Sequence, residues 1–324
     1  MAITDFCSIA SIPNLFIELT INLKDFLVYP GLTKEQLTGD YKIDLNIMNY
    51  VERENWVSSP IYIRRFSVPE APVGKEQEFA FTTASKHMED FINTLILFKP
   101  SIAFLSRGPF WVLEEIGGKV SGTGKGDFSV VPKLAITEKY DLQSSEYSDF
   151  SKFFDVCYPY FSAGIKSDLD KSISNAYYWL TKVRINLQPY DRLIFLITAL
   201  ESLVGAGTEL THRISHRTAT ALGKDSIERG KIYDKISDYY GQRSTLLHGR
   251  KEIISNAQLY DLAEMVRVMI LRFASLSLNS YETTHNGLMK KLDRAVVDDI
   301  LRNEIIKISR ESFTSRSDPQ LKLS

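Results

Sequence analysis

Residues 189–205 read PYDRLIFLITALESLVG, and this stretch determines how the second half of the chain is interpreted. Proline is favoured at the first position of a helix. Apolar residues at 193, 196, 197, 200, 203 and 204 recur at the spacing of one buried helix face. Gly205 and Gly207 then end the pattern, as glycine commonly does after a helix. The stretch predicts an amphipathic helix with one side in a hydrophobic core.

Similar patterns lie on both sides of this stretch. An apolar stripe at helical spacing precedes it, from Leu169 to Leu187. Short loops between long amphipathic helices are typical of an antiparallel bundle. The pattern predicts four further helices, at about 208–222, 226–248, 255–278 and 288–309, followed by a polar C-terminal tail.

The first 150 residues are rich in strand patterns instead. Apolar and polar residues alternate from Tyr41 to Ile47, which is typical of a strand with one buried face. Residues 85–98 favour a helix that ends at Lys99-Pro100, because the residue before proline is driven out of the helical region. Further strands are expected at 15–23, 61–68 and 78–83, and a hairpin with a glycine-rich tip at 111–140.

These patterns together predict the α+β class in two domains. A strand-rich domain would cover residues 1–150, and an all-α helical domain would cover residues 151–324 with the polar tail. The polar, serine-rich segment from Asp141 to Asp149 is the expected boundary between them.

Composition predicts a soluble protein of the cytoplasm. The chain has 324 residues, of which 44% are hydrophobic and 24% are charged, as in ordinary globular proteins. No apolar run reaches the roughly 18 residues that would span a bilayer, so no membrane partner is expected. Cys7 and Cys157 are too few for a disulfide framework or a cysteine-rich zinc site.

Charge is unevenly distributed along the chain. The net charge of −1 excludes nucleic-acid binding through overall positive charge. Between Thr211 and Lys251, however, nine Lys and Arg stand against four Asp and Glu, a local charge of +5 that leaves −6 for the rest. One anion-binding face is one interpretation, and an ordinary solvated helix surface is the other.

Several common functional motifs are excluded. The glycine-rich segment 117–126 lacks the P-loop pattern, since position 119 is lysine and position 126 is glycine. His212 and His216 have the spacing of two ligands on one helix face, but no third ligand is evident, so a solvated basic face is favoured. Neither a metal nor a cofactor is expected.

Arg243 and His248 remain as candidates for chemistry, at the end of the fourth predicted helix. The planar guanidinium matches phosphate oxygens, and histidine exchanges a proton near neutral pH. Together they suit phosphodiester cleavage, in which negative charge gathers on phosphorus while protons move between oxygens. Neither residue type requires a metal ion for this chemistry.

One regular helix does not direct both side chains at a single phosphate. At about 100° per residue, five steps leave Arg243 and His248 roughly 140° apart. Either Gly249 distorts the helix end, or two copies of the chain each supply half of a composite cleft. The second arrangement is preferred.

Residues 168–278 resemble the HEPN superfamily, and in particular its Apea-like branch. This resemblance covers about a third of the chain. It rests on DRLI at 191–194, ALESL at 199–203, HRISHR at 212–217, ISDYY at 236–240 and RSTLLHG at 243–249.

The resemblance implies a HEPN-like antiparallel helical bundle and a metal-independent endoribonuclease that acts as a homodimer in antiphage or toxin-type defence. It implies Arg243 as the phosphate clamp and His248 as the general acid or base. Ser244 follows the arginine where many HEPN nucleases have Asn, Asp or His. Arg250 stands where nucleotidylated members have tyrosine, so that mode of control is not expected.

The remaining site residues and partners are expected around this pair. Glu201 lies in an otherwise apolar helix and needs a partner if buried, which Arg243, Arg213 or Arg217 could supply. A salt bridge within the bundle is an equal alternative to a role in the site. RNA or phosphate contacts are expected from the basic residues Arg213, Arg217, Arg250 and Lys251.

Two other functions stay open at this point. The helical domain could be a non-catalytic module that binds RNA or nucleotide as a dimer and reports to a partner. The N-terminal domain, in which no catalytic set is found, could be the sensor for an invader-derived trigger.

Overall fold

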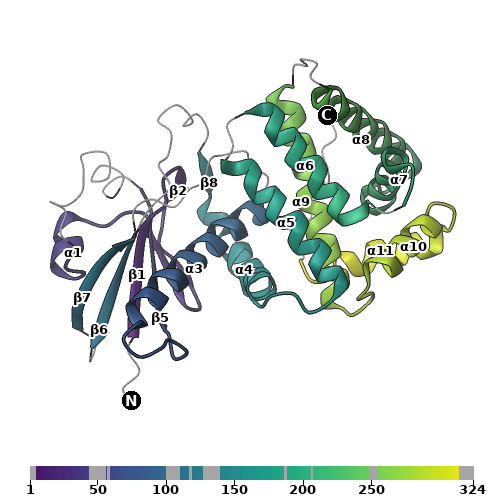
Figure 1. Cartoon of the computed structure of the whole chain (residues 1–324). Coiled ribbons are helices and arrows are strands. Elements are labelled where there is room, and N and C mark those ends of the chain that lie inside the picture. The colour runs from purple at the N-terminus through teal and green to yellow at the C-terminus, as the bar shows by residue number, and fades with distance from the viewer. Residues whose placement is uncertain are drawn as a thin grey trace. The chain divides into compact units, whose positions relative to one another are not determined.

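The computed structural model describes residues 5–43, 56, 59–99, 110–116, 119–126, 139–185, 188–205, 207–248 and 254–313. Contacts divide the chain into two units, of which unit 1 comprises Met1–Leu95 and Ala103–Tyr158, and unit 2 comprises Ile96–Ile102 and Pro159–Ser324. Strands lie near the N-terminus and helices follow (Figure 1), as the α+β class predicts.

Unit 1 contains an antiparallel sheet in the order β3-β4-β5-β1-β6-β7. The central strand β1 (Asp5–Ser11) pairs on one side with β5 and on the other with β6, so that Cys7 lies opposite both Arg65 and Leu113. The flanking strands are β3 (Ile21–Leu23), β4 (Phe26–Tyr29), β5 (Ile61–Ser67), β6 (Phe110–Ile116) and β7 (Lys119–Gly126). A separate parallel pair joins β2 (Leu15–Ile17) to β8 (Tyr140–Leu142).

The sheet is covered on both faces, which explains why β1 is buried along almost its whole length. On one face, Cys7 and Ile9 pack in a cluster with Trp56 and with Leu37 of α1 (Lys34–Gly39). On the other face, Phe6 stacks on Phe66 with ring centroids 6.0 Å apart. A strand buried on both faces has no polar side to alternate with its apolar side.

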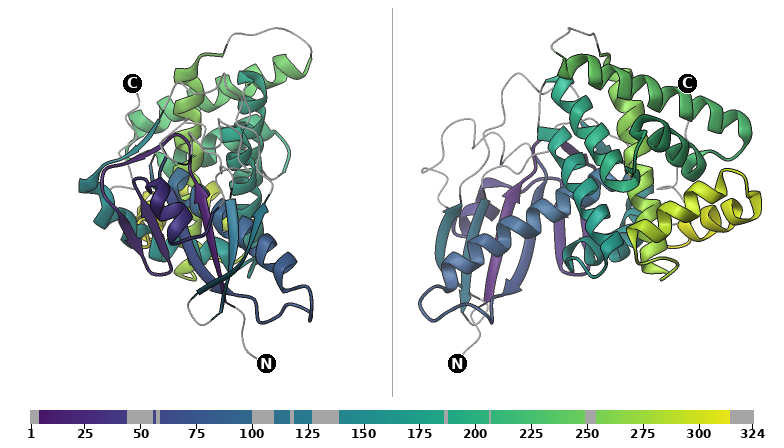
Figure 2. Two further views of the ribbon diagram at one scale, coloured as in Figure 1. Left: turned by 90° about the vertical axis from the view of Figure 1, so that its left-hand side faces the viewer. Right: turned by 45° about the vertical axis from the view of Figure 1, so that its right-hand side comes forward.

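Helix α3 (Glu76–Phe98) crosses this second face of the sheet (Figure 2). Together with the first part of α4 (Tyr147–Ser162), it supplies an aromatic layer there. The ring of Phe91 lies 6.1 Å from that of Phe26 and 5.3 Å from that of Tyr62. Phe154 contacts Phe26 edge-on at 5.1 Å. These rings join the two helices to β4 and β5.

The strand predicted at 78–83 is wrong, because these residues belong to α3. Ala80, Ala84 and Met88 are all fully buried and extend the helical stripe of the segment predicted as helix. Over only six residues an apolar pattern fits both the strand period and the helix period, and these residues are helical as part of the longer helix. The end of α3 at Phe98, before Lys99-Pro100, confirms the predicted stop.

Other strand predictions hold in part. The prediction at 61–68 is confirmed by β5, whereas 15–23 contains two short strands. The predicted hairpin corresponds to β6 and β7, and glycine-rich residues 119–126 form strand β7 rather than its tip. Of the strand predicted from Tyr41 to Ile47, residues 41–43 belong to no strand, and residues 44–47 lie outside the described part of the chain.

The division between the units falls inside α4, between Tyr158 and Pro159, rather than in the polar segment 141–149. Tyr140–Leu142 is strand β8, and α4 begins at Tyr147. Phe150 and Phe154 then enter the aromatic layer of unit 1. The polar residues of this segment include the exposed turn at 143–145.

Unit 2 is built from helices (Figure 1). Helices α5, α6 and α9 pack on one another, and α7 packs on α8. None of the helices among the described residues is both long and apolar enough to cross a membrane. The bounds are α5 (Asp168–Ile185), α6 (Pro189–Val204), α7 (Leu210–Leu222), α8 (Ser226–Leu247), α9 (Asn256–Leu278), α10 (His285–Ala295) and α11 (Asp299–Ser309).

The single helix predicted at 288–309 is wrong, because α10 and α11 are separate helices. Asp298 lies outside the helical region and its side chain accepts a hydrogen bond from the Leu301 amide at 3.0 Å. An aspartate in this position satisfies one of the free amides at a helix start. The break therefore has a local cause, which the continuous apolar pattern concealed.

Buried arginines stabilise the ends of several helices. Arg267 donates from Nη1 to the Leu97 carbonyl at 2.6 Å, at the end of α3. Arg272 donates to the Ala221 carbonyl at the end of α7, and Arg302 donates to the Gly223 carbonyl at 3.0 Å. The last carbonyls of a helix lack partners within it and carry partial negative charge, so a buried cation there is well placed.

His87 makes unit 1 sensitive to acid. Its ring meets Phe66 edge-on at 5.4 Å, and its Nδ1 atom is buried without a hydrogen-bond partner. Burial, together with the charges of Arg64 and Lys86, lowers the pKa of His87 from 6.5 to about 3. As the pH falls below 6.5, the unfolded chain therefore takes up a proton that the folded chain does not, and stability is lost.

We expect His87→Phe to reduce this loss, because phenylalanine can make the same edge-on contact and does not titrate. The urea midpoints of both proteins should be compared at about pH 7 and about pH 5, above the range in which most carboxylates titrate. The midpoint of the variant should fall less between the two pH values. An equal fall in both proteins would exclude His87 as the source.

Candidate functional site

Arg243, Glu201 and Tyr240 form a polar cluster between α6 and α8. The Nη1 and Nη2 atoms of Arg243 lie 3.2 Å and 3.3 Å from the two carboxylate oxygens of Glu201. The Tyr240 hydroxyl donates to Glu201 Oε1 at 3.0 Å, and the guanidinium lies 5.4 Å from the centroid of the Tyr240 ring. Of the three partners considered for Glu201, the structure selects Arg243.

The cluster is partly shielded from water. Both side chains of the ion pair keep about a fifth of their surface exposed, 21% for Arg243 and 22% for Glu201. Burial raises the pKa of Tyr240, and its hydrogen bond to the Glu201 carboxylate raises it further. The Nε atom of Arg243 is buried without a hydrogen-bond partner. The guanidinium thus has an unused donor beside a half-open ion pair.

His248 lies at the end of the same helix and faces solvent. Its backbone amide donates to the Ser244 carbonyl at 3.1 Å, and its side chain is exposed. Within the described part of the chain, its imidazole makes no hydrogen bond. Because α8 is helical through Leu247, the separation of roughly 140° expected between Arg243 and His248 applies. One copy of α8 does not bring the two side chains to one point.

The other residues expected near this pair are only partly described. Ser244 is half-buried in the last turn of α8. Gly249, Arg250 and Lys251 lie outside the residues that the structure describes. Tyr240, which the sequence interpretation missed, stands three residues before Arg243 and therefore on the same helix face. That spacing is the signal that could have found it.

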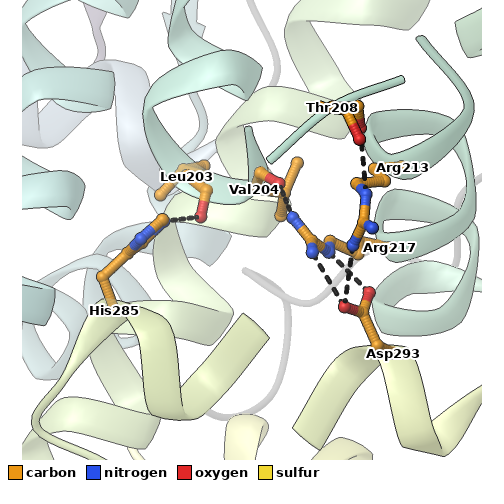
Figure 3. Close-up of polar contacts among 7 residues, drawn as sticks. All are labelled: Leu203, Val204, Thr208, Arg213, Arg217, His285 and Asp293. Atoms are coloured by element: carbon orange, nitrogen blue, oxygen red, sulfur yellow. Dashed lines mark hydrogen bonds and ion pairs between the residues drawn. The ribbon is translucent and has the colours of Figure 1, made fainter. Parts of the chain in front are cut away.

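Arg217 is a structural residue rather than the phosphate ligand expected. Its side chain is 3% exposed, and it donates from Nη1 to the Val204 carbonyl at 2.6 Å, at the end of α6. Its Nε and Nη2 atoms donate to the two carboxylate oxygens of Asp293 at 2.7 Å and 2.8 Å (Figure 3). A guanidinium engaged in this way has no face left for RNA.

Arg213 lies beside it with more of its side chain in solvent. It donates from Nε to the Thr208 carbonyl at 3.0 Å, and its Nη1 lies 3.4 Å from Asp293 (Figure 3). Hydrogen bonds from Arg217, with the charges of both arginines, lower the pKa of Asp293. Nearby, His285 Nε2 lies 2.8 Å from the Leu203 carbonyl, so its imidazole has a partner within unit 2.

His212 and His216 face each other on α7, with His212 exposed and His216 half-buried. Their ring centroids are 4.3 Å apart, and His212 Nδ1 lies 3.2 Å from the Tyr233 hydroxyl of α8. Burial lowers the pKa of His216, and the neighbouring His212 lowers it further. Among the described residues, no group of three or more His, Cys, Asp or Glu side chains is arranged to hold a metal ion.

The described residues of the basic zone therefore form three separate arrangements, around Asp293, Tyr233 and Glu201. Comparison with protein-family models, curated proteins and solved structures found no match to this chain. The candidate site is therefore defined by its geometry alone. It comprises the half-exposed cluster of Arg243, Glu201 and Tyr240, with His248 at the exposed end of α8.

The structural role of Arg217 predicts a loss of stability on its removal. Arg217→Ala leaves the Val204 carbonyl and the Asp293 carboxylate without their buried donor, which should cost about 2 kcal/mol of the free energy of unfolding. This figure is below that of a fully buried pair because Asp293 is 42% exposed. Urea denaturation measures the change.

Arg213→Ala is the matched control for this substitution. Arg213 shares Asp293 as a partner, but its side chain is 37% exposed, so its loss should cost less than about 1 kcal/mol. Equal costs for the two variants would contradict the structural assignment of Arg217.

Proposed function

We propose that this chain is a metal-independent endoribonuclease of the HEPN type, which cuts single-stranded RNA to 2′,3′-cyclic phosphate and 5′-hydroxyl ends. The observation that carries the proposal is the arrangement on α8, where the partly exposed Arg243 is held by Glu201 and the exposed His248 ends the same helix. The resemblance of residues 168–278 to HEPN domains supports the same reaction.

In the proposed reaction, the ribose 2′-oxygen attacks phosphorus and the bond from phosphorus to the 5′-oxygen breaks. A base removes the proton of the 2′-hydroxyl, and an acid returns a proton to the departing 5′-oxygen. His248 serves in this proton transfer, since its side chain is open to substrate. Arg243 stabilises the negative charge that gathers on the phosphoryl oxygens. DNA lacks the attacking hydroxyl and should not be cut.

Two copies of the chain supply the site in this proposal. The separation of roughly 140° on one helix favours Arg243 of one copy acting with His248 of the other. The Tyr240 hydroxyl and the Glu201 carboxylate hold the guanidinium in place. The buried, unpartnered Nε atom of Arg243 is a donor that a small shift of the side chain could direct to a phosphate oxygen.

A second candidate is a non-catalytic HEPN module that binds RNA or nucleotide as a dimer. The observation that favours it is the ion pair of Arg243 with Glu201, because the carboxylate neutralises the charge that a phosphate would meet. In this case the cluster serves mainly to hold α6 to α8, and His248 takes no part in chemistry.

The biological setting follows from the resemblance alone. We place the activity in antiphage or toxin-type defence in the cytoplasm. The N-terminal sheet domain is then the part that recognises an invader-derived trigger and controls the helical domain.

Incubation of the full chain with single-stranded RNA and with DNA of the same sequence, both in EDTA, tests the proposal. We expect only the RNA to be cut, and mapping of its ends should find cyclic phosphates and 5′-hydroxyls. RNA that stays intact but binds with a steep dependence on salt supports the second candidate and contradicts the first.

A further inference from the structure

Trp179 of α5 and Phe195 of α6 form an aromatic pair that is open to solvent. Their rings stack with centroids 5.5 Å apart and planes inclined by 29°, and both side chains are half-buried. Tyr178 meets Trp179 edge-on at 5.3 Å and is 52% exposed. The Lys182 ammonium lies 4.8 Å from the centroid of the Tyr178 ring. A cation therefore borders a group of three accessible rings.

This group differs from the aromatic residues that build the two cores. Phe273 of α9 and the rings of Phe91 and Phe150 in unit 1 are almost completely buried. Burying a large ring is one of the main sources of folding stability. Leaving three neighbouring rings partly exposed therefore does not serve the stability of the bundle. Contiguous exposed apolar surface of this kind commonly marks a binding site.

Phe195 of this pair lies on the same helix as Glu201 of the candidate site. They are six residues apart, which corresponds to about 9 Å along the helix axis and about 120° around it. Both belong to the half-exposed stripe of α6, whereas the opposite side of the helix is buried in the bundle. Thr198 lies on this stripe between Phe195 and Glu201, and Ser202 lies on it one residue beyond Glu201. An RNA strand that follows this stripe along and around α6 would pass from the rings to Glu201, the partner of Arg243.

We propose that Trp179 and Phe195 are a base-stacking site for single-stranded RNA, with Lys182 positioned to contact the adjoining phosphate. Unpaired bases stack on aromatic side chains whatever their sequence, and a neighbouring cation binds the backbone. The inference rests on the proposed ribonuclease function, which supplies RNA as the ligand of this surface. It predicts that this pair selects unpaired RNA, because bases in a duplex are not free to stack on the two rings.

The tryptophans of the chain provide a direct test. Of the three present, Trp56 is 0% exposed and Trp111 is 2% exposed, so Trp179 alone among them has indole surface for a ligand to meet. The probe is a 2′-O-methyl oligoadenylate of about eight nucleotides, within the range of known single-strand sites. Its blocked 2′-oxygen prevents cleavage, so binding is measured whether or not the protein is a nuclease.

We expect this probe to quench the tryptophan fluorescence of the full chain. Trp179→Phe should remove the quenching but keep the affinity, measured by anisotropy of a labelled probe. Trp179→Leu keeps apolar contact between α5 and α6 without an aromatic ring and should weaken binding about tenfold. Tyr260→Leu, at an aromatic residue of α9 that is 42% exposed, is the matched control and should leave the affinity unchanged.

Each of the following binding and association results would overturn the inference. These are unchanged fluorescence at saturating probe, equal affinity in Trp179→Leu and the unsubstituted chain, or a Trp179→Leu variant that loses self-association but binds probe normally. The last result would identify the surface as a contact between subunits. If Trp179→Leu cuts natural RNA normally, the stacking site is excluded and the proposed ribonuclease function is retained. If the probe quenches the tryptophan fluorescence but natural RNA stays intact, the ribonuclease function is excluded and the stacking site is retained.

Discussion

Replacing His248 with alanine should lower the rate of RNA cleavage by about 10²- to 10⁴-fold, the usual contribution of a general acid or base. The fold should be unchanged, because the His248 side chain is exposed and makes no hydrogen bond within the described residues. Its backbone amide, which bonds to Ser244, is retained in the variant. Single-turnover cleavage of labelled RNA in EDTA measures the rate, and thermal unfolding measures the fold.

His212→Ala is the control for the His248 variant. His212 is also exposed, but it lies on α7, where its ring contacts His216 and the Tyr233 hydroxyl, so its loss should leave cleavage almost unchanged. A His248→Ala protein that cuts RNA at the normal rate would remove the proposed mechanism. A rate that falls equally in both variants would point to a general effect of histidine loss on the basic surface.

Replacing Arg243 has the second largest expected effect. Arg243→Ala should lower cleavage by about 10²- to 10³-fold, as the loss of a single donor to a developing negative charge does elsewhere. Arg243→Lys keeps the charge but loses the planar fork that meets both the Glu201 carboxylate and a phosphate, so it should rescue only part of the activity. Rates should be measured with the RNA concentration well above the dissociation constant.

Arg229→Ala is the matched control on the same helix. Arg229 forms an ion pair with Asp299, whose side chain is 73% exposed, and should contribute little to either stability or cleavage. If Arg243→Ala and Glu201→Gln destabilise the fold equally and leave cleavage intact, the cluster is a structural link between α6 and α8. That result would favour the non-catalytic module.

Periodicity predicted the helices of unit 2 because each pattern was long enough to be unambiguous. The stripe in residues 189–204 covers more than four turns, and α6 has those bounds. Residues 78–83 gave too short a window, and only packing of the whole of α3 against the sheet separates the two interpretations. The break at Asp298 was missed because a capping residue acts through one hydrogen bond, which leaves the apolar period almost intact.

The candidate site was predicted less completely than the fold. Arg243 and His248 could be named from their chemistry and spacing, and Glu201 could be recognised as a carboxylate that needs a partner. The partner itself could not be named, because Glu201 and Arg243 are separated by 42 positions and belong to different helices. Three arginines in the basic zone were equally good candidates on charge alone.

What the sequence by itself determined is the class of fold, the position of most helices, and the presence of one basic zone in an acidic chain. These properties depend on residues within one element, where the period of apolar side chains records which face is buried. Only the tertiary structure decided that Arg217 is locked to Asp293 and Val204 while Arg243 stays half-open beside Glu201. Desolvation and pairing of a charge depend on groups brought together from distant segments, and local spacing carries no record of them.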